Sequence, residues 1–238
     1  MKKVIIIGAT SGIGRQLAKL YAGKNWLVGA TGRRNELLQS LQQNYPGNII
    51  TECFDVTGGE NIKCIKNLIQ QLGGLDLLIY NSGYGEPSIT LDWEIDNETT
   101  QVNVNGFVEI VNFAFNYFVQ EGKGQIAATS SIAGIRGGSF APAYNASKAF
   151  MSTYMEGLYI KASKLELPIY IMDIQPGFVN TKMAKGRGQF WVSSVEKAAQ
   201  QMYVAIENKK RRAYITKRWW LIAKLLNLIP ISIYKRIA

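Results

Sequence analysis

The chain has 238 residues, of which 47% are hydrophobic and 18% charged, which is enough apolar material for one large core and excludes wholesale disorder. It contains no histidine, which excludes a Ser-His-Asp hydrolase, a dehydrogenase with a catalytic histidine and a zinc site built on imidazole. The net charge of +10 is concentrated in residues 209–238, which carry nine basic side chains and no acidic one, whereas the first 208 residues hold 18 Lys+Arg against 17 Asp+Glu.

Short apolar runs alternate with helical patterns along the chain. The runs lie at residues 4–7, 26–30, 48–54, 75–79, 125–129 and 169–174. Apolar residues repeat at helical spacing in residues 13–21, 37–41, 62–72, 99–120, 141–164 and 195–208. This alternation is typical of βαβ units around a buried parallel sheet. It predicts an α/β fold with a doubly wound, Rossmann-type sheet in a three-layer αβα arrangement. Residues 1–208 are expected to form a single catalytic domain, with 209–238 as a C-terminal helical appendage.

A glycine-rich loop joins the first predicted strand to the first predicted helix. Gly8 permits a tight turn, Gly12 allows the backbone to approach a pyrophosphate, and Gly14 lets the helix pack on the strand. The free N–H groups at the start of the helix attract phosphate. The candidate phosphate-binding residues are Gly8, Thr10, Ser11, Gly12, Ile13 and Gly14. Glycine turns of this kind are also common as purely structural features. The motifs later in the chain therefore decide whether this loop binds a nucleotide.

Two arginines follow the second predicted strand, where a dinucleotide fold meets the adenosine ribose. An acidic residue there accepts a hydrogen bond from the ribose 2′-hydroxyl, whereas arginine can hold a 2′-phosphate. Gly32 carries no carboxylate, and Arg33 and Arg34 come next. The sequence therefore predicts NADP as the cofactor. The alternative is a solvated basic pair at the start of the next helix.

Tyr144 and Lys148 lie four residues apart in a predicted helix, so their side chains share one face. A phenol with a pKa near 10 is a poor catalyst at neutral pH. A neighbouring ammonium group, together with a positively charged nicotinamide ring, is expected to lower that pKa. With histidine absent, this pair is the candidate proton-handling group. The alternative is an ordinary pair on a helix surface.

These motifs occur in an order that resembles the short-chain dehydrogenase/reductase family over about residues 3–208. The resemblance implies that Tyr144 transfers the proton, that Ser131 donates a hydrogen bond to the substrate oxygen, and that Lys148 assists. It also implies that Asn103 holds a water that continues the proton relay. Ser130 is the alternative to Ser131, and Asn105 is the alternative to Asn103. Strand alternation should point Ser130 and Ser131 in opposite directions, and a capping or packing role for either asparagine stays open.

The resemblance also assigns further cofactor-binding positions. Asp55 and Val56 match the adenine-contacting position, and Asn81 and Gly83 match a motif after the fourth strand. The segment after the sixth strand resembles the motif beside the nicotinamide and contributes Pro176, Gly177, Val179 and Thr181. Ile7, Tyr80 and Ser82 depart from the family's usual residues. All these positions should meet at the carboxyl edge of one sheet.

The expected reaction is hydride transfer between NADP(H) and the carbonyl or secondary alcohol of an apolar small molecule. The substrate walls should come from residues 84–96, 132–140 and 178–191. Lys182, Lys185 and Arg187 stand among glycines, as in a mobile lid, and either meet an anionic carrier or are solvated. The alternative function is a nucleotide-sensing binding module without catalysis. The resemblance implies a homo-oligomer, a dimer or tetramer.

Cys53 and Cys64 are too few for a four-thiolate metal site, and we interpret them as reduced thiols. The apolar run at residues 4–7 is too short for the core of a signal peptide. A cytoplasmic protein without a bound metal is expected. Because the first 208 residues are nearly neutral, no nucleic-acid partner is predicted.

The segment 219–234 is mostly apolar, with basic residues on both sides. It is too short and too interrupted for a transmembrane helix, which needs ~20 apolar residues. Its pattern suits an amphipathic segment in a membrane interface, which would give residues 209–238 a peripheral contact with the inner face of a membrane. The alternative is that its apolar face packs on the substrate pocket or on another subunit.

Overall fold

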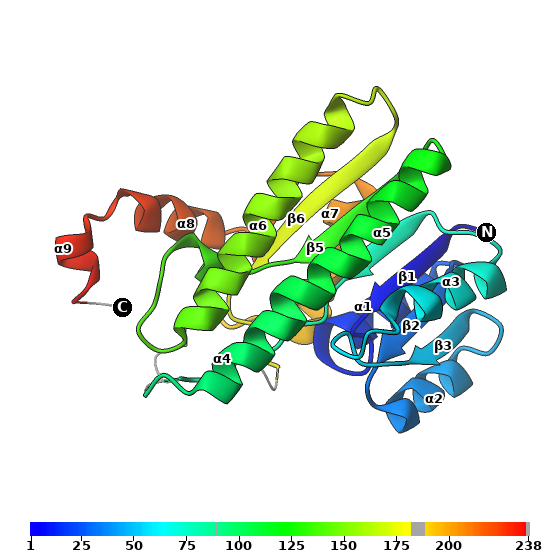
Figure 1. Ribbon diagram of the computed structural model, residues 1–238, viewed down its shortest axis with the longest axis horizontal. Helices are drawn as coiled ribbons and strands as arrows, with labels where there is room; N and C mark the ends of the chain where they lie inside the picture. The colour runs from blue at the N-terminus through cyan, green and yellow to red at the C-terminus, as the bar shows by residue number, and fades with distance from the viewer. Residues whose placement is uncertain (89, 182–188, 237–238) are drawn as a thin grey trace.

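One parallel sheet organises the molecule (Figure 1). The computed structural model describes residues 1–88, 90–181 and 189–236. Its seven strands follow the order β3-β2-β1-β4-β5-β6-β7. They are β1 Lys3–Ile7, β2 Leu27–Gly32, β3 Ile49–Cys53, β4 Leu77–Tyr80, β5 Gly124–Thr129, β6 Ile169–Pro176 and β7 Arg212–Ile215. The direction of winding reverses between β1 and β4, which opens a crevice at the carboxyl ends of the strands.

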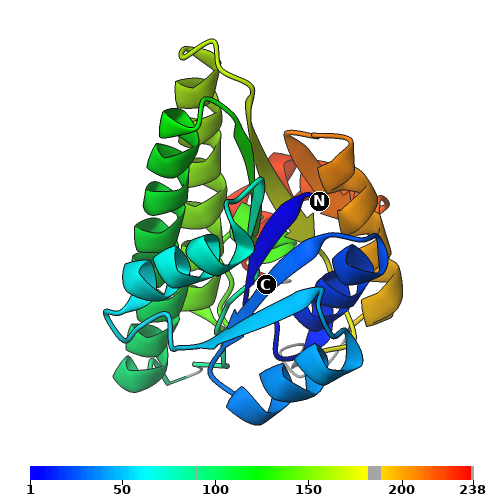
Figure 2. The same cartoon turned by 90° about the vertical axis from the view of Figure 1, so that its right-hand side faces the viewer.

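Helices cover both faces of the sheet, as the three-layer prediction requires. Figure 2 shows the green and yellow-green helices α5 and α6 on one face and the blue α1 and orange α7 on the other. The bounds are α1 Gly12–Gly23, α2 Asn35–Asn44, α3 Asn61–Leu72, α5 Gly106–Gln120, α6 Pro142–Ser163 and α7 Val195–Glu207. Alternate side chains of β1 enter separate cores, with Val4 and Ile6 on the α1 side and Ile5 and Ile7 on the α5 side. The predicted fold class is confirmed.

The long helix predicted at 99–120 has a different internal structure. It begins earlier, with α4 (Trp93–Thr100), and passes through a π-helical segment η1 (Gln101–Asn105) before α5. Asp92 starts α4 by accepting hydrogen bonds from the N–H groups of the first turn. A Cβ at Gly106 would lie 2.6 Å from the carbonyl oxygen of Val56, so only glycine lets the helix pass this close to the loop after β3.

The sheet continues past residue 208, which the sequence analysis took as the end of the domain. β7 pairs with β6 along its whole length, and Arg212 Nε donates to Asp173 at 3.1 Å in a pair that is largely buried. Beyond β7, α8 (Trp219–Leu228) and α9 (Ile231–Tyr234) extend away from the sheet (Figure 1). Within residues 1–88, 90–181 and 189–236, no helix has both the length and the apolar character needed to cross a bilayer.

Candidate functional site

A cavity of about 1160 Å³ lies along the carboxyl edge of the sheet. Its walls include the loops after β1 to β6, one side of α6 and the inner side of α8. Ordinary small-molecule pockets occupy roughly 300–1,000 Å³, so this one has room for a dinucleotide and a second molecule. The predicted residues that line it are Gly8, Thr10, Ser11, Gly12, Ile13, Arg33, Arg34, Asp55, Val56, Asn81, Gly83, Ser131, Tyr144, Lys148, Pro176, Gly177, Val179 and Thr181. Gly14 and Asn103 support it from behind.

The glycine loop leaves the start of α1 open toward this cavity. Gly8 and Gly12 have φ values of +87° and +55°, a left-handed conformation that favours glycine. A Cβ at Gly8 would lie 2.7 Å from the backbone nitrogen of Ser82, so glycine also permits the close approach of the neighbouring loop. Ser11 is the N-cap of α1, but its side chain makes no capping hydrogen bond. The first N–H groups of α1 therefore keep their capacity to bind phosphate.

Asn81 ties three of the loops together. Its Oδ1 accepts a hydrogen bond from Thr129 Oγ1 at 3.0 Å, and its Nδ2 lies 3.5 Å from the carbonyl oxygen of Gly8. A Cβ at Gly14 would overlap that same Gly8 oxygen and lie 2.8 Å from Asn81 Nδ2. Gly14 and Asn81 thus hold the loops after β1, β4 and β5 in one position at the floor of the cavity.

The two arginines after β2 have different environments. Arg34 donates to the hydroxyls of Thr10 and Ser11, the latter at 2.7 Å, and so braces the phosphate loop. The Arg33 side chain is 57% exposed and lies 3.3 Å from Asp55 and 3.6 Å from Glu98. Exposed pairs of this kind contribute little to stability. Arg33 is consequently the guanidinium that can turn toward an incoming phosphate.

The Asp55 carboxyl group is ionised at neutral pH. Burial acts to raise its pKa, but hydrogen bonds from the backbone N–H and hydroxyl of Thr57 and the nearby Arg33 outweigh burial, so that the pKa lies below its ordinary value. The carboxylate stands beside Val56 in the cavity wall. It can accept a hydrogen bond from an amino group such as that of adenine.

Ser131, Tyr144 and Lys148 come together on one wall of the cavity. A side-chain hydrogen bond joins Ser131 to Tyr144, and Lys148 Nζ lies 5.7 Å from the centre of the Tyr144 ring. Lys148 Nζ also donates to the carbonyl oxygen of Thr129 at 3.0 Å. Ser130 points into the interior instead, where its hydroxyl donates to Asp173. Strand alternation therefore separates the two serines as expected, and Ser131 is the one beside Tyr144.

The pKa values of this group are governed by burial. Burial raises the pKa of Tyr144 above its ordinary value, and the hydrogen bond from Ser131 opposes this only in part. Burial lowers the pKa of Lys148 to about 8, against the opposing attraction of Asp173. The lowering of the Tyr144 pKa expected from the sequence combined the Lys148 ammonium with a positively charged nicotinamide ring. In the protein alone desolvation is the larger effect, so the phenol is held in its protonated form at neutral pH.

Asn103 is fully buried in η1 and clamps a loop of the cavity rim. Its Oδ1 accepts from the backbone N–H of Tyr84 at 2.9 Å, and its Nδ2 donates to the Tyr84 carbonyl at 2.7 Å and to Ser147 Oγ at 2.9 Å. Asn105 lies on the exposed side of the same segment and bonds Gln101. Of the two asparagines, Asn103 is therefore the one that contacts the rim of the cavity. Its hydrogen bonds directly support a role in positioning the loop at Tyr84.

Replacement of Asn103 by alanine is expected to lower the free energy of unfolding by about 2–4 kcal/mol, because the buried Ser147 hydroxyl and the part-buried N–H and carbonyl of Tyr84 lose their partner. Asn105→Ala is the matched control and should change it by less than about 0.5 kcal/mol. Urea denaturation of both variants measures the difference. Equal stability of the two variants would show that the clamp at Tyr84 is not a structural requirement.

Aromatic rings close the end of the cavity beyond Gly177. A Cβ at Gly177 would overlap the indole of Trp219, so glycine allows α8 to pack against the motif after β6. Phe178, Phe190 and Trp219 form a cluster with ring centroids 5.0–6.1 Å apart. Trp219 is only 3% exposed, and its Nε1 has no hydrogen-bond partner among the residues that the structure describes. This buried, unpaired donor lies where α8 packs against Gly177.

From the sequence, packing of the C-terminal segment on the pocket was only an alternative. Ile222 and Leu226 line the cavity next to Trp219, so the alternative in which the C-terminal segment packs on the substrate pocket holds for one face of α8. The paired tryptophans at 219 and 220 were the only available signal. The expected lid residues Lys182, Lys185 and Arg187 lie outside the described residues, as does Ile89.

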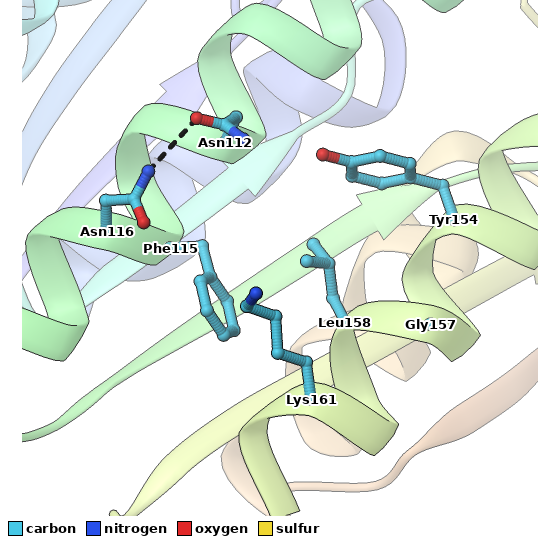
Figure 3. Close-up of a pocket in the computed structure, with 7 residues that line it drawn as sticks. All are labelled: Asn112, Phe115, Asn116, Tyr154, Gly157, Leu158 and Lys161. Carbon is cyan, nitrogen blue, oxygen red and sulfur yellow. Dashed lines mark hydrogen bonds between the residues drawn. The ribbon is translucent and has the colours of Figure 1, made fainter. Parts of the chain in front are cut away.

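A second, smaller cavity of about 300 Å³ lies between α5 and α6 (Figure 3). A hydrogen bond of 3.0 Å from Asn116 to Asn112 runs along its α5 side, and Tyr154 and Lys161 face it from α6. It contains none of the predicted site residues. The chemistry is therefore assigned to the cavity at the sheet edge.

Comparisons with known proteins identify the family of the chain. The family model described as short chain dehydrogenase matches residues 2–190. An uncharacterized oxidoreductase of Myxococcus xanthus (strain DK1622) is 33% identical over 188 residues, covering 76% of this chain and 74% of the relative. A short-chain dehydrogenase from Sphingobium yanoikuyae, solved in complex with NADPH, has a TM-score of 0.81 at 20% identity and covers 98% of both chains. One from Burkholderia phymatum, in complex with NAD, has a TM-score of 0.83 at 19% identity and covers 94% of this chain and 92% of that one. At such low identity these two structures establish a shared fold.

Proposed function

The chain belongs to the short-chain dehydrogenase family of oxidoreductases, and on that premise we propose that it transfers a hydride between NADP(H) and the carbonyl or secondary alcohol of an apolar small molecule. The observation that carries the proposal is the meeting of Ser131, Tyr144 and Lys148 on the wall of the cavity that also contains the glycine loop. A binding module would need the glycine loop but not a phenol, a hydroxyl and an ammonium group gathered on one wall of the cavity.

The residues present fit a dinucleotide cofactor. The uncapped N-terminus of α1 suits the pyrophosphate, the half-exposed Arg33 suits a 2′-phosphate, and Gly177, Val179 and Thr181 would border the nicotinamide. NADPH supplies the hydride when it is bound. Solved relatives carry either NADPH or NAD, so the preference for NADP is argued from Arg33 and not from them.

In the direction of reduction, Tyr144 donates its phenolic proton to the carbonyl oxygen, while Ser131 donates a hydrogen bond to that oxygen. The raised pKa keeps the proton on Tyr144 until the carbonyl oxygen gains negative charge. The Lys148 ammonium then stabilises the phenolate that remains. In our proposal Asn103 supports this arrangement and the return of a proton through a water. Oxidation of an alcohol follows the same steps in reverse.

The pH dependence of the reduction should report Lys148. Its pKa of about 8 means that the ammonium is present below this value and is lost as the pH rises through it. We therefore expect kcat/KM for NADPH, which reflects the free protein, to be constant on the acid side and to decline above about pH 8. In Lys148→Arg the guanidinium stays charged, so the remaining activity should lack this decline. A wild-type profile that is flat through this region would contradict the role given to Lys148.

The proposal is tested by following NADPH oxidation with a panel of apolar ketones and aldehydes, each repeated with NADH. Turnover of any panel member that prefers NADPH supports it. Tight NADPH binding with no turnover across the panel would indicate the nucleotide-sensing module instead.

The proposal also includes a homo-oligomer in the cytoplasm, with residues 209–238 near the inner face of a membrane. Analytical ultracentrifugation measures the oligomeric state.

A further inference from the structure

Helix α8 has two apolar faces that meet different surroundings. On its inner face, Trp219 and Ala223 are buried, and Ile222 and Leu226 line the cavity. Arg136 holds the far end of the helix by donating to the carbonyl oxygens of Leu226 and Ile229, each at 2.8 Å. The outer face of α8 is therefore held in a fixed orientation relative to the cavity.

The outer face continues onto α9 and is made of large apolar side chains exposed to solvent. Leu228 is 79% exposed, and Leu221 and Leu225 are 57% and 56% exposed. We define the tail face as Trp220, Leu221, Leu225, Leu228, Ile231 and Ile233, all of which are exposed. Both elements project beyond the sheet (Figure 1), so no other part of the described chain covers this surface. Large apolar side chains that are exposed together on neighbouring elements in this way are typical of an interaction site.

Basic residues flank the tail face in the sequence. Lys217 and Arg218 precede it, Lys224 lies within it, and Lys235 and Arg236 follow it. No acidic residue occurs anywhere in 209–238. Leucines and a tryptophan flanked by cations are the composition of segments that lie in the interface of an anionic bilayer.

We propose that the tail face docks the protein on the surface of an anionic lipid bilayer. A second copy of the chain is a poorer occupant, because a two-fold contact through this face would bring the basic clusters of both copies together. A bilayer with anionic headgroups instead offers apolar depth for the leucines and negative charge for the lysines and arginines.

Docking has a consequence for the substrate, and this part rests on the proposed function. Phe140 and Phe190 line the cavity and are also partly exposed at its rim, and the ring of Phe190 lies 5.0 Å from that of Trp219 on α8. The tail face and the cavity thus share one helix. A carbonyl compound dissolved in lipid would reach the cavity without crossing open water, so the substrate class is a lipid-soluble ketone, aldehyde or secondary alcohol.

The docking proposal is tested by flotation of the full-length protein with vesicles of phosphatidylcholine alone and of phosphatidylcholine mixed with phosphatidylglycerol. Wild type should float with the anionic vesicles at least about tenfold more than with the neutral ones at low salt, because lysines and arginines near an anionic surface add strongly to binding. The triple variant Leu221→Ser/Leu225→Ser/Leu228→Ser should lose this flotation. Ile160→Ser/Val204→Ser removes exposed apolar residues of α6 and α7 and serves as the matched control, which should float like wild type.

Each outcome is decisive for the docking surface. Equal flotation of the triple variant and wild type would overturn the proposal, as would a wild type that stays with the solution in both vesicle types. The proposal would also be overturned if wild type formed a dimer and did not bind vesicles, while the triple variant was monomeric. A second copy of the chain would then be the occupant of the tail face. The triple variant leaves the cavity lining intact and should keep its thermal stabilisation by NADPH. Failure of docking is therefore distinguishable from failure of the proposed function.

Discussion

Tyr144→Phe is expected to lower kcat for carbonyl reduction by about 10²–10⁴-fold, the range typical of a lost general acid, while NADPH binding is retained. The phenyl ring fills the same space on α6, so the cavity keeps its shape. What disappears is the proton that burial holds on the oxygen and the hydrogen bond with Ser131. Stopped-flow measurement of NADPH oxidation, together with a fluorescence titration of NADPH, separates the two effects.

The same helix offers a matched control. Tyr154 also lies on α6, but its ring packs against Phe107 and Phe150 and faces the smaller cavity of Figure 3. Tyr154→Phe makes the same chemical change away from the proposed site and should leave kcat unchanged. If Tyr144→Phe turned over at the wild-type rate, the proton donor would have to be another group and the mechanism proposed above would be wrong.

Arg33→Gln is expected to weaken the binding of NADPH by about 10–100-fold, since a charge-assisted hydrogen bond contributes about 1.5–3 kcal/mol, and to leave NADH binding nearly unchanged. The neutral substitution is preferable to Arg33→Asp, because a new carboxylate would stand beside Asp55 and Glu98 and add repulsion unrelated to the cofactor. Isothermal titration with both nucleotides gives the two affinities.

Arg34→Gln distinguishes reading of the 2′-phosphate from general support of the loop. Because Arg34 bonds the hydroxyls of Thr10 and Ser11, its loss should weaken NADPH and NADH to a similar extent. A loss confined to NADPH in Arg34→Gln, with no change in Arg33→Gln, would exchange the roles of the two arginines. An unchanged preference in both variants would show that neither arginine contacts the 2′-phosphate.

Most of the fold was predictable because its signals are local. Strands buried on both faces need continuous apolar runs, and such runs lie at or next to six of the strands that the structure contains. β7 was missed because Arg212–Ile215 lies at the edge of the sheet, where only Ile215 is buried, and so lacks the continuous apolar run of a central strand. It is stabilised by pairing with β6 and by the contact between Arg212 and Asp173, and neither appears in the sequence pattern.

The π-helical turn inside the long helix could not be predicted from the sequence for a related reason. Apolar spacing located the helix but carried no signal for the π-helical turn η1, which brings Asn103 to Tyr84 and Ser147. That turn is stabilised by contacts between residues far apart in the chain.

The sequence by itself determined the order of β1 to β6 and of the main helices between them, the loops that follow these strands, and the separation of Ser130 from Ser131, because side-chain periodicity is a property of neighbouring residues. Only the tertiary structure decided the direction of the Tyr144 pKa, the different environments of Arg33 and Arg34, and the two faces of α8. These depend on desolvation and on partners brought together by folding. Such effects arise from the whole packed molecule, and no stretch of sequence contains them.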